Sequence, residues 1–196
     1  MQDLTASIQL PVSAETAFRV ISDLNTLLRI SPFFTLTKFA PPDYGPPRLW
    51  TSYTVTLDYY ATRRIETLNL TVDAIEPGRA ISFAIKEGAL RGIRYDIDRS
   101  EGGITLTQTL MLEDADETVK AASLNELQLW MRSVGEYMML ADGGSLPRKL
   151  LLGFMDRIWL KLTLSERNIA IIITKISLLE LSLLLILVLA WRMFVQ

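Results

Sequence analysis

Between residues 4 and 112, apolar and polar positions alternate along most of the chain, as in GIRYDIDR over 92–99. A period of two residues is typical of strands that bury one face, and several such strands form an antiparallel sheet covered on a single side. Turn residues such as Pro77-Gly78 and Gly102-Gly103 separate the alternating segments. The pattern predicts seven strands, over 4–10, 33–40, 49–60, 63–76, 80–87, 92–99 and 104–112.

Helical spacing replaces alternation in three places. Two short helices are predicted over 14–22 and 25–30, between the first two strands, with Ser13 as a cap. A long helix is predicted over 114–141, because apolar residues recur there every three or four positions. We expect an α+β fold in which this helix covers the apolar face of the sheet.

The order of strand, two short helices, six strands and long helix resembles the START/Bet v 1-like (SRPBCC) superfamily, which has the helix-grip fold. The opening segment is also similar to that family; its matching residues are Pro11, Ala14, Glu15, Phe18, Ile21, Ser22, Asp23, Leu24 and Leu27, followed by Pro32. Ile30-Ser31 stand where such sequences often carry an aromatic residue before that proline. The resemblance covers 4–141 and implies a domain over 1–142, with a curved sheet gripping the long helix around a cavity.

The superfamily includes lipid, sterol and quinone carriers, polyketide cyclases and small-ligand binders. It has no shared catalytic residues, so the resemblance implies a pocket and not a reaction. The candidate lining comprises the inward faces of the sheet and the long helix: Tyr53, Phe83, Ile85, Tyr95, Ile97, Leu106, Gln108, Leu110, Met131, Val134 and Met138. Gln108 and the two tyrosine hydroxyls are its polar groups, as ligand cavities require a few of these. The alternative is a dry core in which Gln108 bonds to the backbone.

The composition excludes several kinds of site. Cysteine and histidine are both absent, so this chain holds no disulfide, no Ser-His-Asp triad and no Cys/His zinc site. A net charge of −2 gives no reason to expect nucleic acid as a partner. We expect no metal or other cofactor. A cyclase or aromatase would need an acidic side chain that faces inward. Glu66 is the one candidate, because it alternates in step with the apolar residues Leu68 and Leu70. We expect Glu66 to be solvated and assign no catalytic residue.

Residues 169–191 include only two charges in 23 residues. About 20 apolar residues in a helix cross a hydrocarbon core of about 30 Å, so 168–192 is predicted to be a single transmembrane helix. The N-terminal segment has neither the basic nor the apolar region of a signal peptide. Basic residues precede the span (Lys149, Arg157, Lys161, Arg167), whereas Arg192 alone follows it. The positive-inside rule therefore predicts a cytoplasmic N-terminal domain.

Residues 143–167 are predicted to form a linker and a basic amphipathic helix, the helix over 146–162. Leu150, Phe154, Ile158 and Leu162 form an apolar stripe at four-residue spacing, flanked by Lys149, Arg157 and Lys161. Such a helix before a span is typical of an element on the membrane surface, with Trp159 at headgroup depth. Packing against the N-terminal domain or a partner is the alternative.

Glu180 lies inside the predicted span, with Ser177 on the same helix face. An intramembrane carboxylate is costly and usually faces protein or water, which predicts an integral-membrane partner or a second copy of this chain. Protonation of Glu180 or local thinning of the bilayer is the alternative. Two functions follow: a membrane-anchored binder of an apolar lipid, quinone or polycyclic molecule, or an accessory subunit or assembly factor of a larger membrane complex.

Overall fold

The computed structural model describes residues 2–41, 45–86, 88–113 and 117–195. The chain divides into two compact units, Met1–Lys161 and Leu162–Gln196, which are described separately below.

Seven antiparallel strands form one sheet in the first unit, in the order β1-β7-β6-β5-β4-β3-β2. Their order and number agree with the alternation in the sequence, and their ends differ from the predicted ones by up to three residues. The strands are β1 Gln2–Leu10, β2 Phe34–Ala40, β3 Ser52–Tyr59, β4 Arg64–Glu76, β5 Ala80–Ile85, β6 Leu90–Ser100 and β7 Gly103–Leu112.

The two faces of the sheet differ as the alternation predicts. On β3, Tyr53, Val55 and Leu57 are buried, whereas Thr54 and Thr56 lie on the outer face. There Thr54 Oγ1 donates to Asn69 Oδ1 of β4 at 2.9 Å, and further hydroxyl pairs join β3 to β4 and β1 to β7. The polar residues therefore form a bonded outer surface, and the apolar residues are free to pack under the helices.

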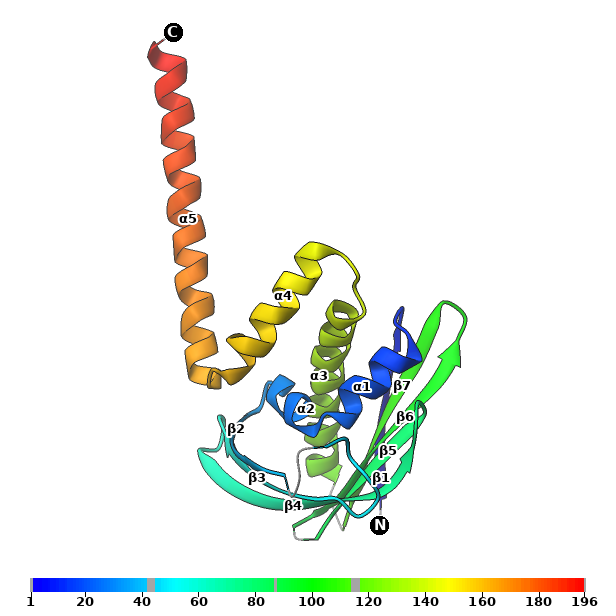
Figure 1. The fold of residues 1–196 in the computed structure, drawn as a ribbon. Coiled ribbons are helices and arrows are strands. Elements are labelled where there is room, and N and C mark those ends of the chain that lie inside the picture. The colour runs from blue at the N-terminus through cyan, green and yellow to red at the C-terminus, as the bar shows by residue number, and fades with distance from the viewer. Residues whose placement is uncertain (1, 42–44, 87, 114–116, 196) are drawn as a thin grey trace. The chain divides into compact units, whose positions relative to one another are not determined.

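Three helices lie on the inner side of the curved sheet (Figure 1). They are α1 Ala14–Ser22, α2 Leu24–Ile30 and α3 Glu117–Ala141; the predicted start of α3 at 114 lies outside the described residues. Ser13 and Asp23 cap α1 and α2 by accepting the backbone N–H of Thr16 and Thr26 at 3.2 Å. This is the helix-grip arrangement that the element order predicted.

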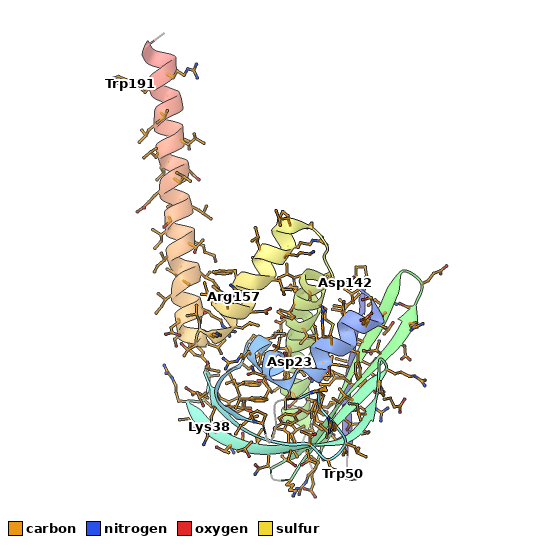
Figure 2. All side chains as sticks on the ribbon, in the orientation of Figure 1. Asp23, Lys38, Trp50, Asp142, Arg157 and Trp191 are labelled. Atoms are coloured by element: carbon orange, nitrogen blue, oxygen red, sulfur yellow. The ribbon has the colours of Figure 1, made fainter. Side chains whose placement is uncertain are left out.

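α3 approaches β1 closely at Gly135. A Cβ atom at this position would lie 2.9 Å from Leu10 Cδ2, so the missing side chain brings the helix against the strand. The end of α3 is also tied to the start of α1, because Ser13 Oγ donates to Asp142 Oδ1 at 2.7 Å (Figure 2). Sheet and helices thus share one core.

The predicted helix over 146–162 is wrong in its last residues. α4 covers Leu146–Arg157, and a short 3₁₀ helix, η1, covers Trp159–Lys161. The break inserts Leu160 into the core, where it is 4% exposed, and Arg29 Nη1 of α2 donates to its carbonyl at 3.3 Å. α4 and η1 therefore pack on the domain, and the apolar stripe of α4 ends at Ile158.

The second unit contains one helix, α5 Leu164–Val195. It begins with a capping box, in which Glu166 Oε2 accepts the Thr163 N–H at 2.7 Å and Thr163 Oγ1 accepts the Glu166 N–H at 3.2 Å. Its segment Leu164–Arg192 includes the predicted span, and an 18-residue stretch within this segment has a mean hydropathy of 2.4. By length and composition, α5 is able to cross a membrane.

Candidate functional site

Two polar side chains face each other within the apolar interior of the first unit. Tyr95 of β6 and Gln108 of β7 are cross-strand neighbours, 1% and 0% exposed. Among the described residues, neither the Tyr95 hydroxyl nor the amide nitrogen and oxygen of Gln108 has a hydrogen-bond partner. The predicted bond from Gln108 to the backbone is therefore absent among the described residues, whereas the other half of that alternative, a dry core, stays untested.

Unpaired polar atoms in such a place are energetically unfavourable. Each buried donor or acceptor without a partner costs about 1–3 kcal/mol, so native interiors usually supply one. Burial raises the pKa of the Tyr95 phenol, while the adjacent Gln108 side chain acts in the opposite direction without reaching hydrogen-bonding geometry. The pair thus offers unused donors and acceptors to a water molecule or to a polar group of a ligand.

Trp130 of α3 supplies a third such group. Its indole N–H is buried without an acceptor among the described residues, and its ring meets Phe34 of β2 edge-on, with ring centroids 5.7 Å apart. Trp130 was not among the predicted lining residues, although it follows Leu127 by three positions on the buried face of the helix.

The predicted lining residues share one inner surface. Ten of the eleven are buried and Leu110 is half-buried; the full set is Tyr53, Phe83, Ile85, Tyr95, Ile97, Leu106, Gln108, Leu110, Met131, Val134 and Met138. The unpaired polar atoms of this set are concentrated at β6 and β7.

A pocket of about 580 Å³ opens beside this interior at Tyr53. Phe39 of β2 and Tyr53 stack there with ring centroids 5.7 Å apart, and Arg19 and Asp23 supply charges from α1 and its C-terminal cap. Burial and the Asp23 carboxylate raise the pKa of Tyr53. The remaining lining residues are Ser22, Leu24, Asn25, Pro41, Gly45, Pro46 and Pro47. The volume is within the range of small-molecule sites.

A second pocket, of about 390 Å³, lies between α1–α2 and α3–α4 and shares Arg19 and Asp23 with the first. Tyr137 Oη of α3 donates to Asp156 Oδ1 of α4 at 2.6 Å in its wall. Burial and then this bond raise the pKa of Tyr137. Figure 2 shows Asp23 at the α1–α2 junction, and this residue lines both pockets. Neither pocket is lined by Tyr95 or Gln108.

Comparison with solved structures agrees with this architecture. Protein TTHA0849 from Thermus thermophilus superposes with a TM-score of 0.57 at 14% identity, covering 72% of this chain and 100% of that one. The Aha1 dimer structure from Colwellia psychrerythraea gives 0.54 at 10% identity, covering 73% and 100%. Ara h 8.0201 gives 0.52 at 14% identity, covering 70% and 97%. The chain has the helix-grip fold. No protein-family model and no curated protein matches the sequence.

The interior of the helix-grip domain holds little that could act as an acid or base. Among the described residues, the buried polar side chains other than tyrosine and tryptophan are Thr16, Ser31, Ser82 and Gln108, so no carboxylate, lysine or arginine is buried. Glu66 has inward parity but pairs with Arg64 at 3.3 Å, and its side chain is 25% exposed. The buried polar groups that the described part of the interior contains are thus neutral ones.

The predicted membrane residues lie outside this interior. Phe154 and the cations Lys149, Arg157 and Lys161 are exposed, whereas Trp159 is half-buried with its ring 6.5 Å from that of Phe154. In the second unit, Ser177 and Glu180 are both exposed. Among the described residues, Glu180 has no hydrogen-bond or ion-pair partner.

Proposed function

We propose that the helix-grip domain binds an elongated apolar molecule that carries a carbonyl or hydroxyl group, and that α5 holds this domain at a membrane. The observation that carries the proposal is the pair of unpaired polar side chains, Tyr95 and Gln108, in an otherwise apolar interior.

The chemistry of the pair favours a neutral polar group. Gln108 offers N–H donors and a carbonyl acceptor, and Tyr95 offers one hydroxyl. These groups match the carbonyl or hydroxyl of a quinone, a sterol or a polycyclic ring system. A charged ligand group is disfavoured there, because the described surroundings include no buried opposite charge to compensate its desolvation.

The pocket at Tyr53 supports an elongated ligand. Tyr53 lies on β3 and Tyr95 on β6, three strands further across the sheet. The register aligns Tyr53 with Ile85 and Tyr95 with Ile81, four residues along β5, so with strands about 4.8 Å apart and about 3.3 Å per residue the two positions are about 20 Å apart along the sheet. A molecule that enters at the Tyr53–Phe39 stack and bonds to Gln108 therefore needs a body of about this length.

Membrane attachment rests on α5. Its length and mean hydropathy suit a span, and the basic residues that precede it favour a cytoplasmic helix-grip domain under the positive-inside rule. A binder held in this way would exchange an apolar ligand with the bilayer over a short distance.

The test is to purify the full chain in a mild detergent, extract it with organic solvent and identify the bound molecules by mass spectrometry. We expect an apolar molecule with a carbonyl or hydroxyl group at a fixed ratio to protein. A domain that retains no such molecule and takes up none from a panel of quinones and sterols contradicts the proposal.

Two isosteric variants locate the site. Gln108→Met and Tyr95→Phe remove the polar atoms and preserve shape, so we expect each to reduce retained ligand about tenfold, as the loss of a buried hydrogen bond predicts. Thr107→Val is the matched control, since Thr107 adjoins Gln108 but bonds to Ser7 on the outer face. If all three variants retain the same amount of ligand, the ligand does not bind at Tyr95 and Gln108.

Glu180 favours a second function, that of an accessory subunit docked on an integral-membrane partner. A single carboxylate within an apolar helix is most readily accommodated against protein. Mild-detergent purification of the wild type, Glu180→Leu and the control Ser182→Ala tests this function. Loss of an associated protein in Glu180→Leu alone supports it, and a monomer in all three counts against it.

A further inference from the structure

We propose that the outer face of α4 lies on the surface of a bilayer that contains anionic lipids, and that this contact fixes the orientation of the helix-grip domain. The inference rests on the proposed function in one respect, namely that α5 spans the same membrane.

α4 is firmly attached to the domain through one side only. Leu152 and Met155 pack against the core, Asp156 accepts the Tyr137 hydroxyl at 2.6 Å, and Leu160 of η1 is buried. These contacts come from α3 and α2 and leave the opposite side of α4 exposed in the described part of the first unit. The helix therefore moves with the domain as one body.

The opposite side is a continuous apolar row. Leu146, Leu150, Phe154 and Ile158 follow one another at four-residue spacing and are 72%, 68%, 44% and 52% exposed, with Leu151 beside them at 51%. Twelve residues of helix make the row about 18 Å long. An exposed apolar row of this length on a soluble surface marks a binding face.

The charges around the row favour lipid over a second protein. The segment 146–161 contains four basic residues, Arg148, Lys149, Arg157 and Lys161, all exposed. Its one acidic residue, Asp156, is engaged by Tyr137 on the inner side. An apolar stripe bordered by cations is the composition of helices that lie in the headgroup region of anionic membranes.

Chain connection favours the same occupant. Only residues 162 and 163 separate η1 from α5. An α5 that spans a bilayer therefore keeps η1, and the end of α4 next to it, within a few residues of that bilayer. Lys149, Leu152 and Asp156 of α4 line the 390 Å³ pocket on the inner side of the helix, so lipid on the outer row leaves this pocket uncovered.

The absence of cysteine from the chain makes a site-specific test direct. Spin labels are attached to the full chain at Leu150→Cys, at Phe154→Cys, at Gln128→Cys on the exposed side of α3, and at Leu184→Cys in α5. Each variant is reconstituted into phosphatidylcholine vesicles with and without phosphatidylglycerol. Collision rates with oxygen, which concentrates in lipid, and with a water-soluble nickel chelate report the depth of each label.

We expect the labels at 150 and 154 to collide mainly with oxygen, and to do so more strongly when phosphatidylglycerol is present, while the label at 128 collides mainly with nickel. Arg157→Gln and Lys161→Gln should each weaken the phosphatidylglycerol-dependent population at 154 about fivefold, which is the expected effect of one cation near an anionic surface. Arg132→Gln on α3 is the control and should change nothing.

Three results would overturn the proposal. If the label at 184 is exposed to lipid but the labels at 150 and 154 are exposed to water, α5 spans the membrane and α4 does not contact it. A water-exposed label at 184 removes the anchor as well. Spin–spin broadening at 150 would show that a second copy of the chain, and not lipid, covers the row.

Discussion

Three tyrosines of the helix-grip domain, Tyr59, Tyr95 and Tyr137, lie where a phenolate is strongly disfavoured. Burial, followed by the nearby Glu66 carboxylate, raises the pKa of Tyr59 to about 12. Burial also raises the pKa of Tyr95, and burial with the Asp156 bond raises that of Tyr137. All three side chains therefore keep their protons in the folded chain at a pH where an unfolded tyrosine loses its own.

This difference predicts alkaline destabilisation. Unfolded tyrosines ionise near pH 10, so the stabilisation from the neutral buried phenols is fully present below about pH 10 and is lost as the pH rises through the raised pKa values. Tyr59 alone accounts for about 2 kcal/mol between about pH 10 and 12, after allowance for its partial exposure. Urea unfolding at increasing pH, with phenolate absorbance as the readout, should show ionisation of these tyrosines coinciding with unfolding. Their titration near pH 10 in a domain that is still folded would contradict the prediction.

The alternation of apolar and polar residues along the strands predicted which side chains face inward. It did not predict which of their polar atoms have hydrogen-bond partners. Gln108 alternates with Leu106 and Leu110 in the sequence, and this was enough to place it in the interior. Its unpaired state depends on Tyr95 across β6 and on the helices above, and no local pattern encodes these. The same limit explains why Trp130 was missed, since its indole N–H matters only once Phe34 and the core surround it.

At the scale of elements, Ser13 joins the beginning of α1 to the end of α3. Its hydroxyl accepts from Thr16 N at 3.2 Å and donates to Asp142 Oδ1 at 2.7 Å. Hydrogen bonds from the hydroxyls of Thr16 and Ser13 lower the pKa of Asp142. The stabilisation from the ionised carboxylate is thus present above its ordinary pKa and is lost as the pH falls through the lowered value.

We predict that Ser13→Ala lowers the free energy of unfolding by about 1 kcal/mol near neutral pH, the usual effect of losing an N-cap. The difference from wild type should shrink in acid, where Asp142 is protonated in both proteins. Urea unfolding at neutral and acidic pH measures both effects, with the exposed Ser100→Ala as control. An equal loss in Ser13→Ala and Ser100→Ala would show that the cap contributes nothing.

η1 offers a sharper comparison, because two apolar residues within three positions have opposite environments. Leu160 is 4% exposed and Ile158 is 52% exposed. We predict that Leu160→Ala costs about 2–3 kcal/mol, at the lower end for buried leucines because the site is near the surface, and that Ile158→Ala changes stability by less than about 0.5 kcal/mol in detergent. Hydrogen exchange in α4 should rise only in Leu160→Ala. Similar exchange in both variants would contradict the packing of η1 on α2.

Ile158 and Leu160 also show why the sequence pattern did not predict where α4 ends. Spacing of four residues continued through Leu162, so one helix over 146–162 was consistent with the local pattern. The burial of Leu160 beneath Arg29 ends α4 earlier, and this contact joins residues 131 positions apart. The pocket at Tyr53 is likewise assembled from segments far apart in the sequence: α1, α2, β2, the chain after β2, and β3.

At the scale of the whole molecule, the two compact units are expected to have separate roles, one in folding of the helix-grip domain and one in membrane attachment. The first unit includes η1 and therefore retains Leu160 in its core. The second is a helix whose described apolar surface has no partner within that unit. Folding of the helix-grip domain should thus be independent of α5, whereas retention in the membrane should depend on it.

We predict that a chain ending at Lys161 folds with the same cooperativity as the full chain, because the truncation removes no buried residue of the first unit. Its free energy of unfolding should lie within about 0.5 kcal/mol of the full-length value in detergent.

The full chain should remain with membranes through an alkaline carbonate wash, since a spanning helix is inserted almost irreversibly, whereas the truncated chain should wash off. Before that wash, the truncated chain should still bind anionic vesicles through α4, and salt should release it because the attraction of its cations to lipid is screened. If the truncated chain stays with membranes after the carbonate wash, α5 is not the anchor. If the truncated chain does not bind anionic vesicles, α4 does not contribute to membrane binding.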